Sequence, residues 1–124
     1  MLNTSDTTLN ESILRQFTGT ENWYRHPLFK HFTYTDGVKY VAEQGGEYWL
    51  IDKIFGAQYS NINLPEQEFQ VWILEHENIR GATLVCHDGD YNYQHHEKLI
   101  FSDFPMSKIT LYFCNSVLLL LSEY

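Results

Sequence analysis

Residues with metal-binding chemistry crowd into one short stretch of the chain, residues 87–96, which reads HDGDYNYQHH. Its imidazoles and carboxylates belong to His87, Asp88, Asp90, His95 and His96. The aspartates alternate as at the start of a calcium loop, but the sixth-position glycine is replaced by Tyr93 and no glutamate follows at the twelfth position. Three histidines could bind zinc, yet neutral histidines are equally compatible with a polar hairpin that binds no metal. We therefore expect a solvated loop at 88–94 that binds no metal.

Carboxylates form a second group of candidate functional residues, where strands are expected. Glu75 and Glu77 stand two positions apart, so on a strand both side chains project from one face. The carboxylates of the 88–90 segment lie beyond the neighbouring predicted strand and would extend this acidic stripe. Paired carboxylates can perform acid–base catalysis, but the sequence assigns no aromatic-lined cleft. We interpret the stripe and two adjacent tyrosines as a partner-binding surface. Its predicted residues are Glu75, Glu77, Asp88, Asp90, Tyr91 and Tyr93.

The charge of the chain indicates which classes of partner are favoured and which are disfavoured. Its 124 residues include 16 acidic and 8 basic ones, for a formal net charge of −8, and the second half carries most of the excess. An acidic surface repels phosphate backbones, so direct nucleic-acid binding is disfavoured despite the aromatic and basic cluster at 23–26. A protein partner with a basic surface is favoured. The sequence has no glycine-rich phosphate loop and no serine-nucleophile elbow, so we expect neither a cofactor nor a catalytic residue.

Apolar periodicity predicts helices in the first half of the chain. Apolar residues recur at spacings of three and four over 9–17, 36–44 and 47–58. The second of these segments has a competing interpretation, a hairpin turned by Asp36-Gly37, and we prefer the helix. Residues 21–32 contain Pro27 and are expected to form an irregular segment over the core.

From residue 69 the apolar period changes to two, which predicts strands. We expect these at 69–77, 82–87, 98–101, 109–114 and 117–121. The last two form the most apolar run, ITLYFCNSVLLLL, and should fold back on each other at the centre of the sheet. The predicted fold class is α+β, with two or three N-terminal helices packed on a C-terminal four- or five-stranded antiparallel meander sheet. Residues 1–8 are expected to be disordered and residues 9–124 to form a single domain.

Composition also bears on the location of the protein. The chain does not begin with a basic and then apolar leader, and VLLLL is far shorter than the roughly 20 apolar residues that span a bilayer. Cys86 and Cys114 lack metal-binding spacing and are expected to be buried, reduced thiols. We expect a cytoplasmic monomer or homodimer that does not contact membranes.

Several segments, taken in order, carry a resemblance that spans nearly all of residues 14–124. They are FTGTENWYRHPLF, YTDGVKYVAEQ, YWLIDKI, FQVWIL, FSDFP, ITLYF and the final SEY. Together they resemble a family of small uncharacterised bacterial proteins, a domain of unknown function found in genomes and on mobile elements. The resemblance implies a mobile-element context and brings no assigned activity or site.

The predicted function is that of a non-enzymatic, acidic protein-binding module. In its most concrete form, the protein is a mobile-element inhibitor or regulator of a basic, nucleic-acid-binding host complex, acting against host defence. The alternative interpretation is a small metal-dependent or hydrolytic enzyme that uses the loop of residues 87–96.

Overall fold

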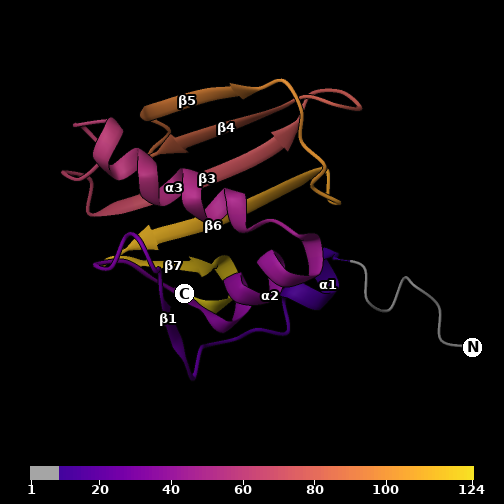
Figure 1. Ribbon diagram of the computed structural model, residues 1–124, viewed down its shortest axis with the longest axis horizontal. Helices are drawn as coiled ribbons and strands as arrows, with labels where there is room; N and C mark the ends of the chain where they lie inside the picture. The colour runs from indigo at the N-terminus through magenta and orange to yellow at the C-terminus, as the bar shows by residue number, and fades with distance from the viewer. Residues whose placement is uncertain (1–8) are drawn as a thin grey trace, which may run out of the picture.

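The computed structural model describes residues 9–124, in which seven strands form one mixed sheet with α2 and α3 against one of its faces (Figure 1). The predicted disorder of residues 1–8 lies outside this part of the chain. In chain order the elements are α1 (Glu11–Leu14), β1 (Trp23–Arg25), β2 (Thr33–Thr35), α2 (Asp36–Gly45), α3 (Tyr48–Ser60), β3 (Phe69–His76), β4 (Ala82–His87), β5 (Tyr93–Leu99), β6 (Lys108–Cys114), β7 (Val117–Leu120) and η2 (Leu121–Glu123). The strand order is β1-β2-β7-β6-β3-β4-β5; β2 and β7 pair in parallel, and the other neighbours are antiparallel.

All three predicted helices are present, and the first two begin at capping side chains. Asn10 Oδ1 accepts a hydrogen bond from the Ile13 amide at 3.0 Å, and Thr35 Oγ1 accepts one from the Val38 amide at 3.3 Å. α2 ends at Gly46, whose φ of 69° is a left-handed conformation that glycine adopts without strain. The segment 36–44 is therefore helical, and Asp36-Gly37 forms its first turn instead of a hairpin.

The core lies between α3 and the central strands. The helix buries an apolar stripe that includes Ile54 and Phe55, both with no exposed surface. Phe55 packs against Phe113 of β6 with ring centroids 5.7 Å apart, and Trp72 of β3 is 1% exposed. Burying such side chains is worth roughly 1.5–3 kcal/mol each, so this contact fixes α3 across β3 and β6.

The predicted four- or five-stranded antiparallel meander is wrong. The sheet has seven strands, and two of them, β1 and β2, precede α2. β1 lies within residues 21–32, which we expected to be irregular, and β2 follows directly after them. Each of these strands is three residues long, too short for a period of two to be recognised, and β2 is held by pairing with β7 about 80 residues later. The meander is also interrupted, because residues 100–107 carry the chain back past β4 and β3 so that β6 pairs with β3.

The closing hairpin was predicted well, whereas the boundaries of β5 were not. β6 and β7 pair antiparallel from Leu111 opposite Leu120 to Cys114 opposite Val117, and they lie in the middle of the sheet. β5 begins at Tyr93, within the expected loop, and ends at Leu99. β5 is difficult to recognise in the sequence because its residues are mostly polar and one of its faces is exposed. Its pairing with β4 is also irregular, with a shift in register between Cys86 and His87.

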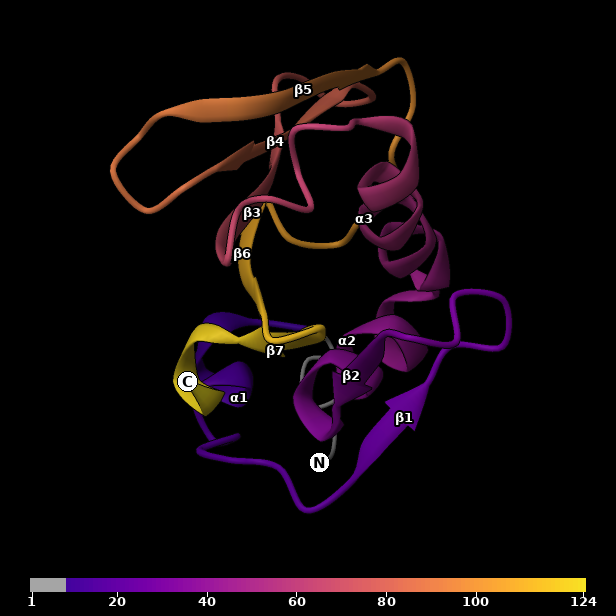
Figure 2. The same ribbon diagram turned by 90° about the vertical axis from the view of Figure 1, so that its left-hand side faces the viewer.

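One face of β3, β4 and β5 has no helix over it among residues 9–124. Figure 2 shows α2 and α3 on one side of the sheet and the loop joining β4 to β5 projecting from the other side. We call this second surface the open face. On this face β3 presents Val71, Ile73 and Glu75, and β4 and β5 bring Val85 and His96 into the same row as Ile73.

Candidate functional site

The open face holds a shallow depression of about 330 Å³. Its lining residues are Ile73, Glu75, Thr83, Val85, Tyr93 and His96. Apolar β-branched side chains form the floor, whereas the edge on β5 carries an aromatic ring and an imidazole. A mixed apolar and polar concavity of this kind suits contact with another molecule, because a bare sheet face otherwise exposes apolar surface to water.

The loop that follows β4 is built by Asp88. Its carboxylate accepts hydrogen bonds from the Asp90 amide at 2.8 Å, the Asn92 amide at 3.2 Å and the Asn92 side chain at 2.9 Å. These bonds, first among them that from the Asn92 side chain, lower the pKa of Asp88. Asp88 therefore remains ionised and its first role is to hold the loop in one shape.

Tyr91 stands at the tip of this loop in an unusual backbone conformation. Its φ of 64° lies in the left-handed region, where a bulky residue is disfavoured and glycine or asparagine is common. The side chain is 73% exposed, and its ring stacks on His87 with centroids 4.9 Å apart. Tyr93 meets the same imidazole edge-on at 5.3 Å. A strained backbone at an exposed tyrosine makes Tyr91 a candidate contact residue.

The predicted acidic stripe is divided between two ends of the sheet. Glu75 pairs with Thr83 at the start of β4, whereas Asp88 follows the end of that strand, about 16 Å farther along at 3.3 Å per residue. The structure therefore brings Asp88 and Asp90 together with Tyr91, and it does not bring Glu75 to them.

The two ends also differ in their surrounding charges. Glu75 lies opposite Lys108 on β6, and Glu77 Oε1 is 3.8 Å from Lys98 Nζ. At the other end Glu68 and Asp90 are exposed, with no ion-pair partner among the residues that the structure describes. We call that end the acidic tyrosine patch, which consists of Glu68, Asp88, Asp90, Tyr91 and Tyr93.

Sequence reasoning missed the aromatic support behind this patch. Phe69 lies close to the loop, since a Cβ added to Gly89 would meet its ring at 3.5 Å. Phe69 also contacts Tyr112 at 4.8 Å and Tyr124 at 5.5 Å between ring centroids. Phe69 and Tyr112 were recognised only as members of strands, because their proximity depends on the pairing of β3 with β6.

The three histidines of the predicted metal loop do not converge. His87 is 5% exposed on the open face, and its Nδ1 already accepts the Gly89 amide at 3.0 Å. His95 lies on the opposite face of the sheet, where it packs against Trp72 at 5.4 Å. His96 returns to the open face beside Val85. Within residues 9–124 no group of three His, Cys, Asp or Glu side chains is arranged to hold a metal ion.

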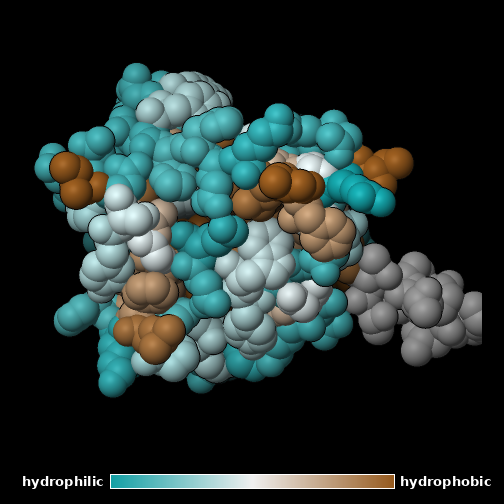
Figure 3. All heavy atoms as spheres, turned by 45° about the horizontal axis from the view of Figure 1, so that its top comes forward, coloured by the Kyte–Doolittle hydropathy of each residue, from teal (hydrophilic) through white to brown (hydrophobic). Residues whose placement is uncertain are grey.

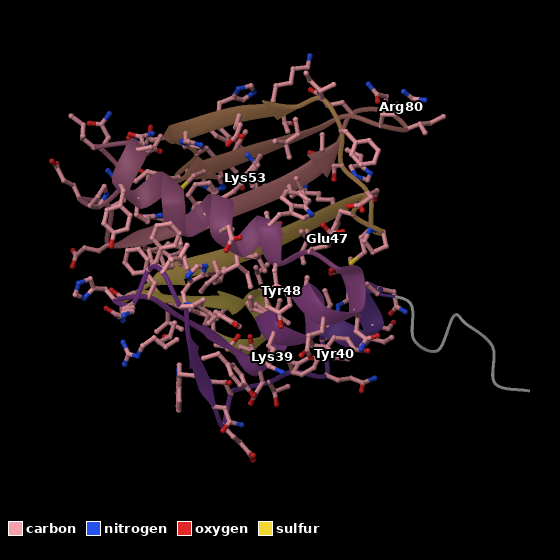
Figure 4. The ribbon with its side chains drawn as sticks, in the orientation of Figure 1. Lys39, Tyr40, Glu47, Tyr48, Lys53 and Arg80 are labelled. Carbon is pink, nitrogen blue, oxygen red and sulfur yellow. The ribbon has the colours of Figure 1, made fainter. Side chains whose placement is uncertain are left out.

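Glu47 is a second feature that the sequence did not reveal. It immediately precedes α3 and is 1% exposed, and neither carboxylate oxygen has a hydrogen-bond partner among residues 9–124 (Figure 4). Burial, together with the negative charge of nearby Asp103, raises the pKa of Glu47 to about 7. A carboxyl group with this pKa can exchange a proton near neutrality, but its oxygens are sealed from solvent and cannot touch a substrate.

The far end of the sheet carries exposed apolar side chains from two adjoining loops. Ile79 is 96% exposed, Ile100 91% and Phe101 68%. The loops are joined by a hydrogen bond of 2.7 Å from the Ser102 amide to the Arg80 carbonyl. Figure 3 shows several separate groups of apolar spheres among hydrophilic ones on the surface. The basic side chains of Arg80, Lys98 and Lys108 make this end unsuitable for a strongly basic partner.

The chain belongs to a family of unknown function (DUF6876), whose model matches residues 8–124. The match covers nearly the whole chain and supports the expected resemblance to an uncharacterised family. No curated protein and no solved structure matches the chain. Among residues 9–124, none of the helices has the length and apolar character needed to cross a membrane.

Proposed function

We propose that this protein is a cytoplasmic, non-enzymatic protein-binding module that uses the acidic tyrosine patch to bind a partner with a basic surface. In bacteria and on their mobile elements, it would inhibit or regulate a nucleic-acid-binding host complex by covering the basic surface of that complex. The observation that carries the proposal is Tyr91, held 73% exposed at a φ of 64° beside unpaired carboxylates.

The shape of the patch supports a role in protein recognition. Tyrosines are enriched at interfaces because a large, stiff ring buries much area at a low cost in side-chain entropy. Tyr91 is additionally fixed by its stacking on His87, and the loop beneath it is fixed by the three hydrogen bonds to Asp88. A partner would therefore meet a preorganised surface, which lowers the free-energy cost of binding.

Electrostatics supports a basic partner at the same place. The net charge of −8 attracts a basic surface from a distance, and the carboxylates of Glu68 and Asp90 lack neighbouring cations that would cancel their field. Contacts between such charges mainly set the association rate and the orientation of the partner. The tyrosines would then supply the buried contacts that slow dissociation.

The proposal can be tested by affinity capture from the native host with matched baits. The wild-type protein should retain a basic, nucleic-acid-binding protein that the double variant Tyr91→Ala/Asp90→Asn does not retain. Tyr48→Ala is the control, because Tyr48 is 42% exposed on α3 and lies outside the patch. Equal retention by the wild type and the double variant, or retention of proteins with no basic surface, would contradict the proposal.

A further inference from the structure

A cavity of about 520 Å³ opens where four distant segments of the chain meet. They are the connection between β1 and β2, the end of α3, the connector that precedes β3, and the turn between β6 and β7. Figure 1 places the connection between β1 and β2 beside the arrow end of β6, at the left of the molecule. The volume falls within the range of small-molecule sites, roughly 300–1,000 Å³.

Aromatic rings form one wall of this cavity. Tyr59 and Phe32 both line it, and their ring centroids are 5.9 Å apart. Tyr59 is braced from outside by Phe29, which stacks on it at 5.5 Å with an angle of 22° between the ring planes. Phe32 is braced by Phe113 at 5.3 Å. The planes of Tyr59 and Phe32 are tilted by 43°, so the two rings form an angled wall on which a flat ring can stack against one and meet the other obliquely.

The floor of the cavity is a pair of buried amides. Gln58 and Gln70 exchange two hydrogen bonds of 2.8 and 2.9 Å, and Gln70 Oε1 also accepts the indole N–H of Trp72 at 2.8 Å. The remaining amide hydrogens go to the carbonyl oxygens of Ile54 and Leu64. Every amide hydrogen is used, so the floor holds one orientation before any ligand arrives.

The rim supplies several polar groups, among them the side-chain amides of Gln67 and Asn115. Gln67 and Asn115 line the cavity and make no side-chain hydrogen bond within the described residues, so their amides can donate and accept. Among the described lining residues there is no lysine or arginine, whereas Glu68 is present. A phosphate or carboxylate would therefore meet the negative charge of Glu68 and no lysine or arginine, and His31 is the other titratable side chain of the lining besides the tyrosine and the cysteine. The site favours a ligand without an anionic group.

We propose that this cavity binds a nucleobase or nucleoside without a phosphate, stacked on Tyr59, in oblique contact with Phe32 and read at its edge by the rim amides. Stacking on aromatic side chains is the general means by which proteins hold bases, and glutamine and asparagine amides match their donor and acceptor edges. The cavity lies on the helix-covered side of the sheet, apart from Tyr91 and Asp90. Glu68 belongs both to this lining and to the acidic tyrosine patch, but Tyr59 lines only the cavity and Tyr91 belongs only to the patch. Loss of ligand binding in Tyr59→Ala and loss of partner binding in Tyr91→Ala can therefore be told apart.

The test is an NMR titration of the ¹⁵N-labelled protein with the four common ribonucleosides, their 5′-monophosphates and ribose. At least one nucleoside should produce saturable shifts in the side-chain amide signals of Gln58, Gln67 and Gln70. Its monophosphate should bind at least about tenfold more weakly, because of the charge at the rim. Tyr59→Ala should weaken binding by about tenfold or more, since one stacked base is worth ~1–3 kcal/mol.

Matched variants separate the stacking role of Tyr59 from a general disturbance. Tyr59→Phe keeps the ring and should bind as the wild type does, and Tyr48→Ala removes another exposed tyrosine of α3 and should also bind normally. Tyr59 is 58% exposed, so its replacement should leave the fold intact, as circular dichroism can verify. The proposal is overturned if no nucleoside shifts the signals, if ribose shifts them equally, or if Tyr59→Ala binds like the wild type.

Discussion

At the scale of single residues, Glu47 is a carboxyl group withdrawn from water at the start of α3. Its folded-state pKa of about 7 lies above the usual value of 4.5. Between these two values the folded protein holds a proton that the unfolded chain has released. The free energy of unfolding therefore falls as the pH rises through this window, and the loss is complete above the folded pKa.

We predict that Glu47→Gln stabilises the protein at pH 8 by on the order of 2 kcal/mol and changes little at pH 4.5, where the wild-type carboxyl is neutral. Urea unfolding at the two pH values measures the difference. Glu66→Gln is the control, since Glu66 is exposed in a connector. An equal effect of Glu47→Gln at both pH values would show that burial of this carboxyl does not govern the pH dependence.

The two cysteines should differ sharply in reactivity. Cys86 has no exposed surface, and burial raises its pKa to about 12. Cys114 is partly exposed, although burial raises its pKa as well. Because the thiolate is the reactive species, alkylation of the native protein should be slow and confined to Cys114. Mass spectrometry after native and denaturing alkylation should show one and two adducts, respectively. Native labelling at Cys86 would mean that β4 opens readily.

At the scale of elements, Asp36 joins α2 to the segment that precedes β1. Its carboxylate accepts hydrogen bonds from the Glu21 amide at 3.0 Å, the Asn22 amide at 3.3 Å and the Tyr24 hydroxyl at 2.8 Å. The bond from Glu21, followed by that from Tyr24, lowers the pKa of Asp36 to about 2. Its stabilising effect is present above the unfolded pKa of Asp and is lost as the pH falls toward 2.

We predict that Asp36→Ala loosens residues 20–24 without unfolding α2, because Thr35 still caps the helix. Amide hydrogen exchange should rise at Glu21 and Asn22 and stay nearly unchanged at Val41 and Ala42. Glu43→Ala is the matched control, since Glu43 pairs with Lys39 at 2.8 Å on the same helix and makes no hydrogen bond to residues 20–25 among the described residues. Unchanged exchange at Glu21 in the Asp36 variant would contradict this role.

Elements with a local signal could be predicted, and elements held by distant partners could not. The stripe of α3, the apolar spacing of α2 and the alternation of β3 all arise from neighbouring residues, and each was found in the sequence. β2 forms because β7 pairs with it, and no pattern in the residues near β2 predicts that pairing. For the same reason the tyrosines of the 88–93 segment were identified, while their support from Phe69 was not.

At the scale of the whole molecule, the sheet connections decide which charges lie together. A simple meander would have left Glu75 and Glu77 on an acidic stripe. Instead, β6 returns beside β3 and places Lys108 opposite Glu75, while Lys98 approaches Glu77. The unbalanced carboxylates therefore lie at the other end, with Asp88 and Asp90. Composition gives the net charge, whereas the order of the strands determines where the carboxylates without neighbouring cations lie.

This placement yields a prediction about association with the partner captured by the wild-type protein. Reversal of Glu68 and Asp90 to lysine should slow association markedly, because exposed charges without neighbouring cations contribute most to the steering field. Reversal of Glu75 and Glu77 should slow it less, since Lys108 and Lys98 already cancel part of their field. Reversal of Glu11 and Glu21, far from the patch, should have the smallest effect.

Association rates of the wild type and the three double variants, measured by stopped flow from low to high salt, test this order. All four rates should converge at high salt, because the screening length falls from about 10 Å at 0.1 M to about 3 Å at 1 M. Dissociation rates should change little, whereas Tyr91→Ala should raise dissociation at every salt concentration. If the three reversals act equally, only net charge matters. If salt has no effect, the carboxylates of the patch are merely solvated and the partner is recognised by other contacts.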